Sequence, residues 1–429
     1  MGSDVDSRAS RSALEHLDAL CAMQPDRRPG SRGNHVATEY VAAEFVRSSW
    51  RVQAQEFACL DWETGGGSIT VGGSTLELTP SPYGLGVVAR GPLRVLRSVG
   101  ELEGTDLAGS IVVLADDLAS EPLTPKAFPF YGSEEHMAIV ASLERSQPAA
   151  VIAVTGLYPD LCGALDPFPL IEDGDFTIPT ANVRPADAAL LLNGEGLMAS
   201  VEIRSERKPS GARNIVAVRG PQNRRVTVVA HVDTKPGTPG AVDNAAGVVV
   251  LLVLADLLTP GRHHLLPIGV ELLVVNGEDH YAAPGEVAWL ESNRDKLDNV
   301  ELMINIDGIG YREGGSAFSL YNVNNEIAEH ARRTFATCED ITEGPQWYQS
   351  DHAIFAMQGR AALALTTERV QEMLAVLFHT EHDTPDKVDV NRIVSIATAL
   401  ETMLTRWPRV PPPAQGSSDG SPESTAPMT

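Results

Sequence analysis

Three predicted strands of this sequence end in side chains that can bind metal ions. The run RVTVVAH ends at His231, VELLVVNGED leads to Glu278 and Asp279, and ELMINID ends at Asp307. In open α/β sheets ligands bind at the carboxyl ends of the strands, so these side chains can converge there. Imidazole nitrogens and carboxylate oxygens are the ligands that hold catalytic zinc. The strand ends therefore predict a zinc site for hydrolytic chemistry.

Two further residues complete a predicted pair of metal sites. GAVDNAAG places Asp243 directly before a predicted helix at 244–258, where its carboxylate either caps the helix or bridges two cations about 3.5 to 4 Å apart. In FHTEHDTPD, His379 supplies a second imidazole, and His382 competes with it for that role. With Asp243 shared, each metal receives one histidine and one carboxylate of its own, which leaves an open position for water.

Glu278 and Asp233 fit supporting roles. Neighbours in an extended segment project differently, so Asp279 can bind a metal while Glu278 acts as the general base. His231 and Asp233 lie two residues apart and point the same way on an extended segment, so the carboxylate can orient the imidazole. The alternatives are a solvated acidic turn at 278–279 and a purely structural hydrogen-bonded pair at 231–233.

The surrounding sequence predicts the elements that position these residues. Apolar residues at helical spacing predict two amphipathic helices at 11–24 and 35–46. Short β-like runs bounded by glycine or proline follow at 51–57, 67–73 and 74–79. From Asn214 onward strands and helices alternate. This alternation predicts an α/β fold with a mixed central β-sheet flanked by helices on both faces.

Composition narrows the function further. The chain has 429 residues, of which 43% are hydrophobic, and a formal charge of −24 from 57 acidic and 33 basic residues. Such a charge repels nucleic acid and anionic membranes, so neither is expected as a partner. The four cysteines form no CxxC pair, which argues against a disulfide framework. Because we find no signal-peptide pattern and no run of about 18 apolar residues, we expect a cytoplasmic protein.

The motifs stand in the order found in a known family. HVD at 231–233, GAVDNAAG at 240–247, GED at 277–279, NIDGIG at 305–310, SDH at 350–352 and FHTEHDTPD at 378–386 resemble the di-zinc metallopeptidase family of aminopeptidase Y, bacterial leucyl aminopeptidase and glutamate carboxypeptidase. With RPGSRGN at 28–34, the resemblance covers nearly the whole chain except its tail. It implies a zinc-exopeptidase fold of the phosphorylase/hydrolase-like kind.

The resemblance also implies a role for each residue. It assigns one zinc ion to His231, Asp243 and Asp307, and a second to Asp243, Asp279 and His379. Glu278 becomes the general base and Asp233 the residue that orients the histidine, while His382 becomes a minor candidate. A cis peptide between Asp243 and Asn244 is implied as well.

A β-rich insert is expected before the metal-binding motifs. The segments DLAGSIVVLAD, QPAAVIAVTG and IPTANVRPADAALLL, within about 105–193, resemble the protease-associated domain, and a generic β-rich insert is the alternative. The resulting division is N-terminal helices of the peptidase domain at 1–65, the insert at 66–205, the zinc peptidase catalytic domain at 206–410, and a disordered tail at 411–429 rich in Pro, Ser and Gly.

Positions 279 and 348 carry two further expectations about the site. Position 279 is Asp where the family usually has Glu, so this ligand is one methylene shorter and its geometry should be altered. In GPQWYQSDHAIF, Tyr348 is the candidate for stabilising the oxyanion of the tetrahedral intermediate. Alternatively, Ser350 and Asp351 cap a helix against which Tyr348 packs.

The sequence thus predicts a metal-dependent exopeptidase, an aminopeptidase that hydrolyses N-terminal peptide bonds with two co-catalytic zinc ions. Its substrate would be a peptide or an amino-acid amide. Carboxypeptidase, dipeptidase or amidohydrolase action and glutaminyl cyclisation on the same site remain alternatives, because the fold does not separate them. A non-catalytic scaffold is the alternative from another class of protein.

Overall fold

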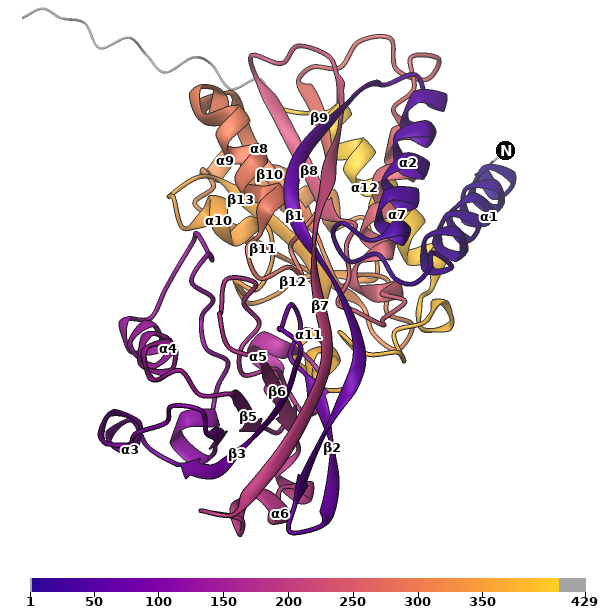
Figure 1. The fold of residues 1–429 in the computed structure, drawn as a ribbon. Coiled ribbons are helices and arrows are strands. Elements are labelled where there is room, and N and C mark those ends of the chain that lie inside the picture. The colour runs from indigo at the N-terminus through magenta and orange to yellow at the C-terminus, as the bar shows by residue number, and fades with distance from the viewer. Residues whose placement is uncertain (1, 409–429) are drawn as a thin grey trace, which may run out of the picture.

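The structure, a computed structural model, describes residues 2–408 as two lobes joined by a long β-ribbon (Figure 1). For description we call residues 66–205 the insert and residues 2–65 with 206–408 the large lobe, although β1 and β7 run through both boundaries. The predicted tail at 411–429 lies outside the described residues. No helix within residues 2–408 is long and apolar enough to cross a membrane.

The helices divide between the lobes. Those of the large lobe are α1 (Gly2–Cys21), α2 (Arg32–Arg47), α7 (Ala246–Leu257), α8 (Pro284–Asn293), α9 (Asn325–Phe335), α10 (His352–Ala356), α11 (Val370–Val376) and α12 (Val390–Thr405). Those of the insert are α3 (Val99–Gly104), α4 (Glu134–Ser146), α5 (Pro159–Cys162) and α6 (Ala189–Leu192). The predicted helices at 11–24 and 35–46 correspond to α1 and α2, and the one at 244–258 to α7 with the turn before it.

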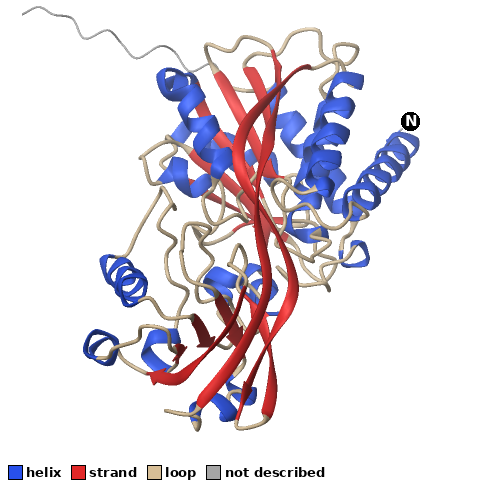
Figure 2. Cartoon of the chain, in the orientation of Figure 1, coloured by secondary structure: helices blue, strands red, loops and turns tan. Residues whose placement is uncertain are grey.

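The strands form one continuous sheet that passes through both lobes (Figure 2). The large lobe contributes β8 (Arg225–His231), β9 (Gly269–Val275), β10 (Val300–Ile306), β11 (Ser316–Tyr321), β12 (Ile341–Glu343) and β13 (Ala362–Thr367). The insert contributes β2 (Ser74–Pro80), β3 (Val87–Leu96), β4 (Ile111–Leu114), β5 (Ala150–Val154) and β6 (Thr180–Val183). Two strands, β1 (Arg51–Val71) and β7 (Met198–Arg219), belong to both lobes.

In the large lobe the strand order is β7-β9-β8-β10-β13-β11-β12. Strands β9, β8, β10 and β13 run parallel to one another. Strand β7 pairs antiparallel with β9, and β11 pairs antiparallel with β13 and parallel with β12. Val228 of β8 packs into the cluster formed with α1, α2, α7 and α12, and its neighbour Val229 packs into the cluster on the other face with Trp289 and Phe355. The predicted mixed α/β sheet with helices on both faces is confirmed.

The β-ribbon is longer than the sequence suggested. The runs at 51–57 and 67–73 were expected to be separate strands, but β1 is continuous for 21 residues and pairs with β7 from Arg51 opposite Val218 to Val71 opposite Ala199. Its middle forms a strand because β7 supplies hydrogen-bonding partners there, with a register shift between Thr64 and Gly67. The expected domain boundaries at 65/66 and 205/206 therefore fall inside unbroken strands.

The insert has its own core. Two hydrophobic clusters lie wholly within residues 69–203, on opposite faces of the parallel strands β3, β4, β5 and β6. Before β7, the insert has a 3-10 turn at Pro185–Asp187 that is followed by α6. Its likeness to a protease-associated domain stays a prediction.

Arg27 fastens the loop between β8 and α7 to the N-terminal helices. Its side chain is fully buried, and its guanidinium donates to the carbonyl oxygens of Val232 at 2.8 Å, Pro239 at 2.6 Å, Gly240 at 2.8 Å and Leu20 at 3.1 Å. A planar guanidinium with five donors suits such a set of acceptors. The loop that carries Asp243 is therefore held in place from its outer side.

Replacing Arg27 with Met should lower the free energy of unfolding by about 3 kcal/mol or more, because several buried carbonyl groups lose their donors together. Denaturant unfolding of the metal-free protein measures this change. Arg32→Met, at an exposed position of α2, is the matched control and should change stability by less than about 0.5 kcal/mol. Equal stability of the two variants would contradict the role assigned to Arg27.

Candidate metal centre

His231 is the last residue of β8 and lies fully buried at the carboxyl end of the sheet. Its Nδ1 lies 3.1 Å from the backbone carbonyl oxygen of Asp233. Since a carbonyl oxygen only accepts, Nδ1 carries the proton, and in the neutral ring Nε2 keeps a free lone pair. That nitrogen lies 3.2 Å from Asp243 Oδ1 and 3.4 Å from Asp307 Oδ1. These three residues form the His231 cluster.

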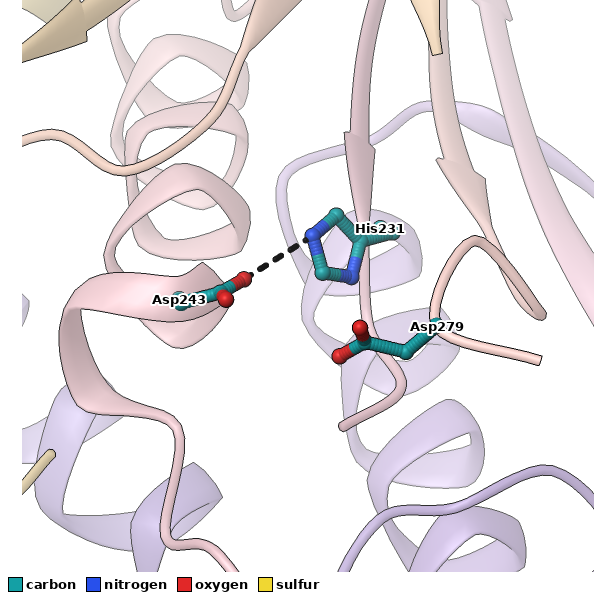
Figure 3. Close-up of side chains that lie close together, drawn as sticks. All are labelled: His231, Asp243 and Asp279. Carbon is teal, nitrogen blue, oxygen red and sulfur yellow. Dashed lines mark ion pairs between the residues drawn. The ribbon is translucent and has the colours of Figure 1, made fainter. Parts of the chain in front are cut away.

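A second group of contacts forms on the other oxygen of Asp243. His379 Nε2 lies 3.3 Å from Asp243 Oδ2 and 3.1 Å from Asp279 Oδ1. We call Asp243, Asp279 and His379 the His379 cluster. Figure 3 shows the Asp243 side chain, from the turn before α7, to the left of the His231 ring and the Asp279 side chain, from the loop after β9, below it. The competing His382 is exposed and lies outside both clusters.

Asp243 stands in a distorted turn, Ala241–Ala245, that precedes α7, and its peptide bond to Asn244 is cis, as the resemblance implied. Its backbone N–H donates to Asp383 Oδ2 at 2.9 Å, and that of Val242 donates to Asp383 Oδ1 at 2.8 Å. The alternative role as a helix cap belongs to the next residue, since Asn244 Oδ1 accepts from the N–H of Gly247. The Asp243 carboxylate therefore remains free to face the two histidines.

Asp233 acts differently from the prediction that its carboxylate orients His231. The carboxylate oxygen lies 3.9 Å from His231 Nδ1, and the backbone carbonyl of the same residue accepts the imidazole proton instead. The carboxylate accepts from three successive backbone N–H groups, those of Gly277 at 2.6 Å, Glu278 at 3.3 Å and Asp279 at 3.0 Å. This fully buried side chain therefore shapes the loop after β9 that presents both acidic residues.

Glu278 points toward the His231 cluster, with Oε2 3.9 Å from His231 Nε2. Burial raises the pKa of Glu278 well above its usual value; His231 opposes this shift, and the charges of Asp279 and Asp307 add to it. A carboxyl group with a raised pKa can take up and release a proton near neutral pH. Its position beside both clusters makes it a candidate general base.

The electrostatics of the clusters depend on the two histidines. Burial alone would lower their pKa values, but Asp307 and Asp243 raise the pKa of His231, and Asp279 and Asp243 raise that of His379, well above the usual range. Burial alone would raise the pKa of Asp243, yet contact with both histidines holds it well below its usual value. The site therefore favours positive charge between its carboxylates.

The donor set fits zinc. Ligand atoms placed tetrahedrally around a zinc ion at about 2.0 to 2.1 Å lie about 3.3 Å from each other, and the contacts within the two clusters measure 3.1 to 3.4 Å. Among the described residues, His231 Nε2, Asp279 Oδ2 and Asp307 Oδ1 are buried without a hydrogen-bond partner. Buried polar atoms normally have partners, so these atoms suit a cation between them.

A cavity of about 430 Å³ opens above the carboxylates. The large lobe lines it with Glu278, Tyr348 and Phe378, and the insert lines it with Phe128 and Tyr131. The hydroxyl of Tyr348 donates to the side-chain oxygen of Gln346 at 3.3 Å, and the residue is 45% exposed. The structure thus places Tyr348 on the cavity wall, and its role at the oxyanion stays a prediction.

Four buried residues near the site were not singled out by sequence reasoning. Lys235 and Glu286 lie outside the motifs, Asp383 stands in FHTEHDTPD without a role of its own, and Asp351 was considered only as a helix cap. Asp351 stands at the start of α10 without capping it, next to Glu286. Burial raises the pKa of Glu286 to about 8. The available signal was an acidic residue inside one of the family motifs, as Asp351 is in SDH and Asp383 is in FHTEHDTPD.

Comparison with known proteins places the chain among related sequences. Residues 214–403 match the sequence model of Peptidase family M28. The chain is 24% identical to the probable lipoprotein aminopeptidase LpqL of Mycobacterium tuberculosis over 71% of its own length and 59% of that protein. It is 25% identical to aminopeptidase YwaD of Bacillus subtilis, over 42% of each protein. The chain therefore spans less than two thirds of the length of either relative.

Solved structures share the fold over nearly the whole chain. An aminopeptidase from Aneurinibacillus sp. strain AM-1 superposes with a TM-score of 0.70 at 19% identity, covering 92% of each chain. The zinc aminopeptidase BSAP from Bacillus subtilis gives a TM-score of 0.68 at 18% identity, covering 92% of this chain and 93% of that one.

Zinc binding should release protons, because His231 and His379 have raised pKa values and must be deprotonated to bind a metal. Below those pKa values the imidazoles are protonated and compete with zinc, so apparent affinity should rise with pH. Calorimetric titration in buffers of different ionisation enthalpy, at about pH 6 and about pH 8, counts the protons. The variant His382→Gln should leave the count unchanged. Binding without proton release at either pH would contradict the assignment.

Proposed function

We propose that this chain, whose residues 214–403 carry a Peptidase family M28 domain, is a metal-dependent aminopeptidase with two zinc ions. The supporting observation is the Asp243 carboxylate, whose two oxygens face different histidines, each with a further carboxylate of its own. A shared carboxylate between two sites is the arrangement used for two-metal hydrolysis. The names of the relatives, aminopeptidases in both cases, agree with this activity.

In this proposal the His231 cluster holds one zinc ion and the His379 cluster holds the other. Zinc held there would supply a Lewis acid for the scissile carbonyl and would make the attacking water more acidic. The Glu278 carboxylate takes a proton from the attacking water and returns it to the leaving amine. Asp233 keeps Glu278 and Asp279 in place through the three backbone N–H groups it accepts from.

The charges around the cavity favour an aminopeptidase over a carboxypeptidase. A carboxypeptidase needs a free cationic side chain to hold the carboxylate of its substrate. Lys235 is the one Lys or Arg side chain lining the cavity within residues 2–408, and Glu172 already pairs with it. The carboxylate of Asp160 also lines the wall, so the cavity suits a substrate with a free α-amine.

Replacing Glu278 with Gln should lower kcat by about 100-fold to 10,000-fold, because the general base is lost while its shape is kept. Zinc content should stay at the wild-type level, since Glu278 belongs to neither cluster. Rates on aminoacyl-anilide substrates and elemental analysis measure the two quantities. Glu291→Gln, on the exposed side of α8, is the control and should retain full activity. A Glu278 variant as active as wild type would remove the mechanism.

Acylating the α-amine of a good substrate should abolish hydrolysis, because a neutral amide no longer suits the acidic cavity. The measurement compares free and N-acetylated forms of the same peptide at equal concentration. Equal turnover of both forms would argue for an endopeptidase or a carboxypeptidase.

A further inference from the structure

Lys235 joins three segments that are far apart in the sequence. It lies in the loop after β8, four residues beyond His231, and its side chain is 12% exposed. Its ammonium donates to both carboxylate oxygens of Glu172, at 3.0 and 3.2 Å, and to the backbone carbonyl oxygen of Asp279 at 2.8 Å. An ammonium has three N–H donors, so these three contacts use all of them. Lys235 is therefore a structural link, with no donor left for substrate.

Glu172 is held firmly by the insert. Its neighbour Ile171 bridges to Leu123, and the next residue, Asp173, accepts from the backbone N–H groups of Lys126 at 3.0 Å and Asp175 at 2.7 Å. The Glu172 side chain is 14% exposed. Burial disfavours the charged form of Lys235, but Glu172 and Asp279 outweigh this effect and raise its pKa, so the ion pair stays charged.

The backbone of Asp279 is consequently hydrogen-bonded through both its N–H and its carbonyl oxygen. Its N–H donates to Asp233 at 3.0 Å, and its carbonyl oxygen accepts from Lys235 at 2.8 Å. Position 279 is the one at which this chain has Asp where the resembling family usually has Glu. Because the Asp279 side chain is one methylene shorter than that of Glu, its carboxylate reaches the metal ion only if the backbone of residue 279 lies closer to the ion. The contacts with Asp233 and Lys235 can hold the backbone in that closer position.

The insert also contacts the other residue of the His379 cluster. The N–H of Ala164 donates to the carbonyl oxygen of Phe378 at 3.1 Å, directly before His379. Gly163 packs so closely that a Cβ there would lie 2.7 Å from His379 Nδ1. Within the described residues, no hydrogen bond or ion pair joins the insert to His231 or Asp307. In the part of the chain that the structure describes, the hydrogen bonds and ion pairs of the insert near the metal centre are thus made beside the His379 cluster.

We propose that Lys235 and Glu172 are positioning residues for the His379 cluster, through which the insert holds the short Asp279 side chain within reach of its metal ion. The inference rests on the proposed two-zinc function. In this inference the insert helps to position the ligands of the His379 cluster and has no such role at the His231 cluster.

The test is zinc affinity in the metal-free full-length protein, measured by competition with a chromophoric chelator. Wild type should bind two zinc ions, and Asp279→Ala identifies the step that belongs to the His379 cluster. Lys235→Met and Glu172→Gln should weaken that step by about 10-fold to 100-fold and leave the other step unchanged. Adding Asp279→Glu to Lys235→Met should restore much of the affinity, because the longer side chain no longer needs the backbone held close.

The matched control is Lys208→Met, which breaks an ion pair with Glu63 on the ribbon and should change neither step. Unchanged zinc affinity in Lys235→Met and Glu172→Gln, equal weakening of both steps, or failure of Asp279→Glu to rescue would each overturn the positioning role. If Lys235→Met does not fold, the isosteric Glu172→Gln carries the same test. A wild-type protein that binds fewer than two zinc ions would contradict the two-metal proposal and this inference with it.

Discussion

The structure of the metal centre depends on one electrostatic constraint. Several carboxylates lie close to two imidazoles in a buried part of the large lobe. Asp243, Asp279 and Asp307 are each less than 10% exposed, and the ligand atoms converge within 3.1 to 3.4 Å of the histidine nitrogens. Buried charges are expensive unless opposite charges compensate them. Protons on the two histidines supply this opposite charge, and so would metal ions bound in place of those protons. The rest of the large lobe can be understood as the scaffold that keeps these groups from separating.

That scaffold works mainly through backbone contacts. Asp233 accepts from three backbone N–H groups of the loop after β9, Asp383 accepts from two in the turn that carries Asp243, and Arg27 donates to the carbonyl groups on the outer side of the same loop. Each contact holds the backbone in position, so the side chains of the metal centre start from fixed Cα positions. Such supporting contacts control how well metal ligands are oriented.

The sequence was informative where chemistry and periodicity coincide. Buried strands that end in His231 and Asp307 predict their own meeting point, because parallel strands bring their carboxyl ends to one edge. The role of the Asp233 carboxylate as an acceptor for three backbone N–H groups could not be predicted from the sequence, since those groups lie 44 to 46 residues later. Lys235 and Glu172 are 63 residues apart and share no spacing pattern. The middle of β1 lacks an apolar alternation and becomes a strand only because β7 lies beside it.

The continuous strands β1 and β7 have a consequence for how the molecule unfolds. Each of them contributes side chains or hydrogen bonds to both lobes, so neither lobe can lose its sheet without exposing strand edges of the other. Lobes connected only by a flexible linker melt independently, whereas lobes that share secondary structure tend to melt as one cooperative unit. The ribbon thus couples the thermodynamic stability of the insert to that of the metal centre, over and above any contact between them.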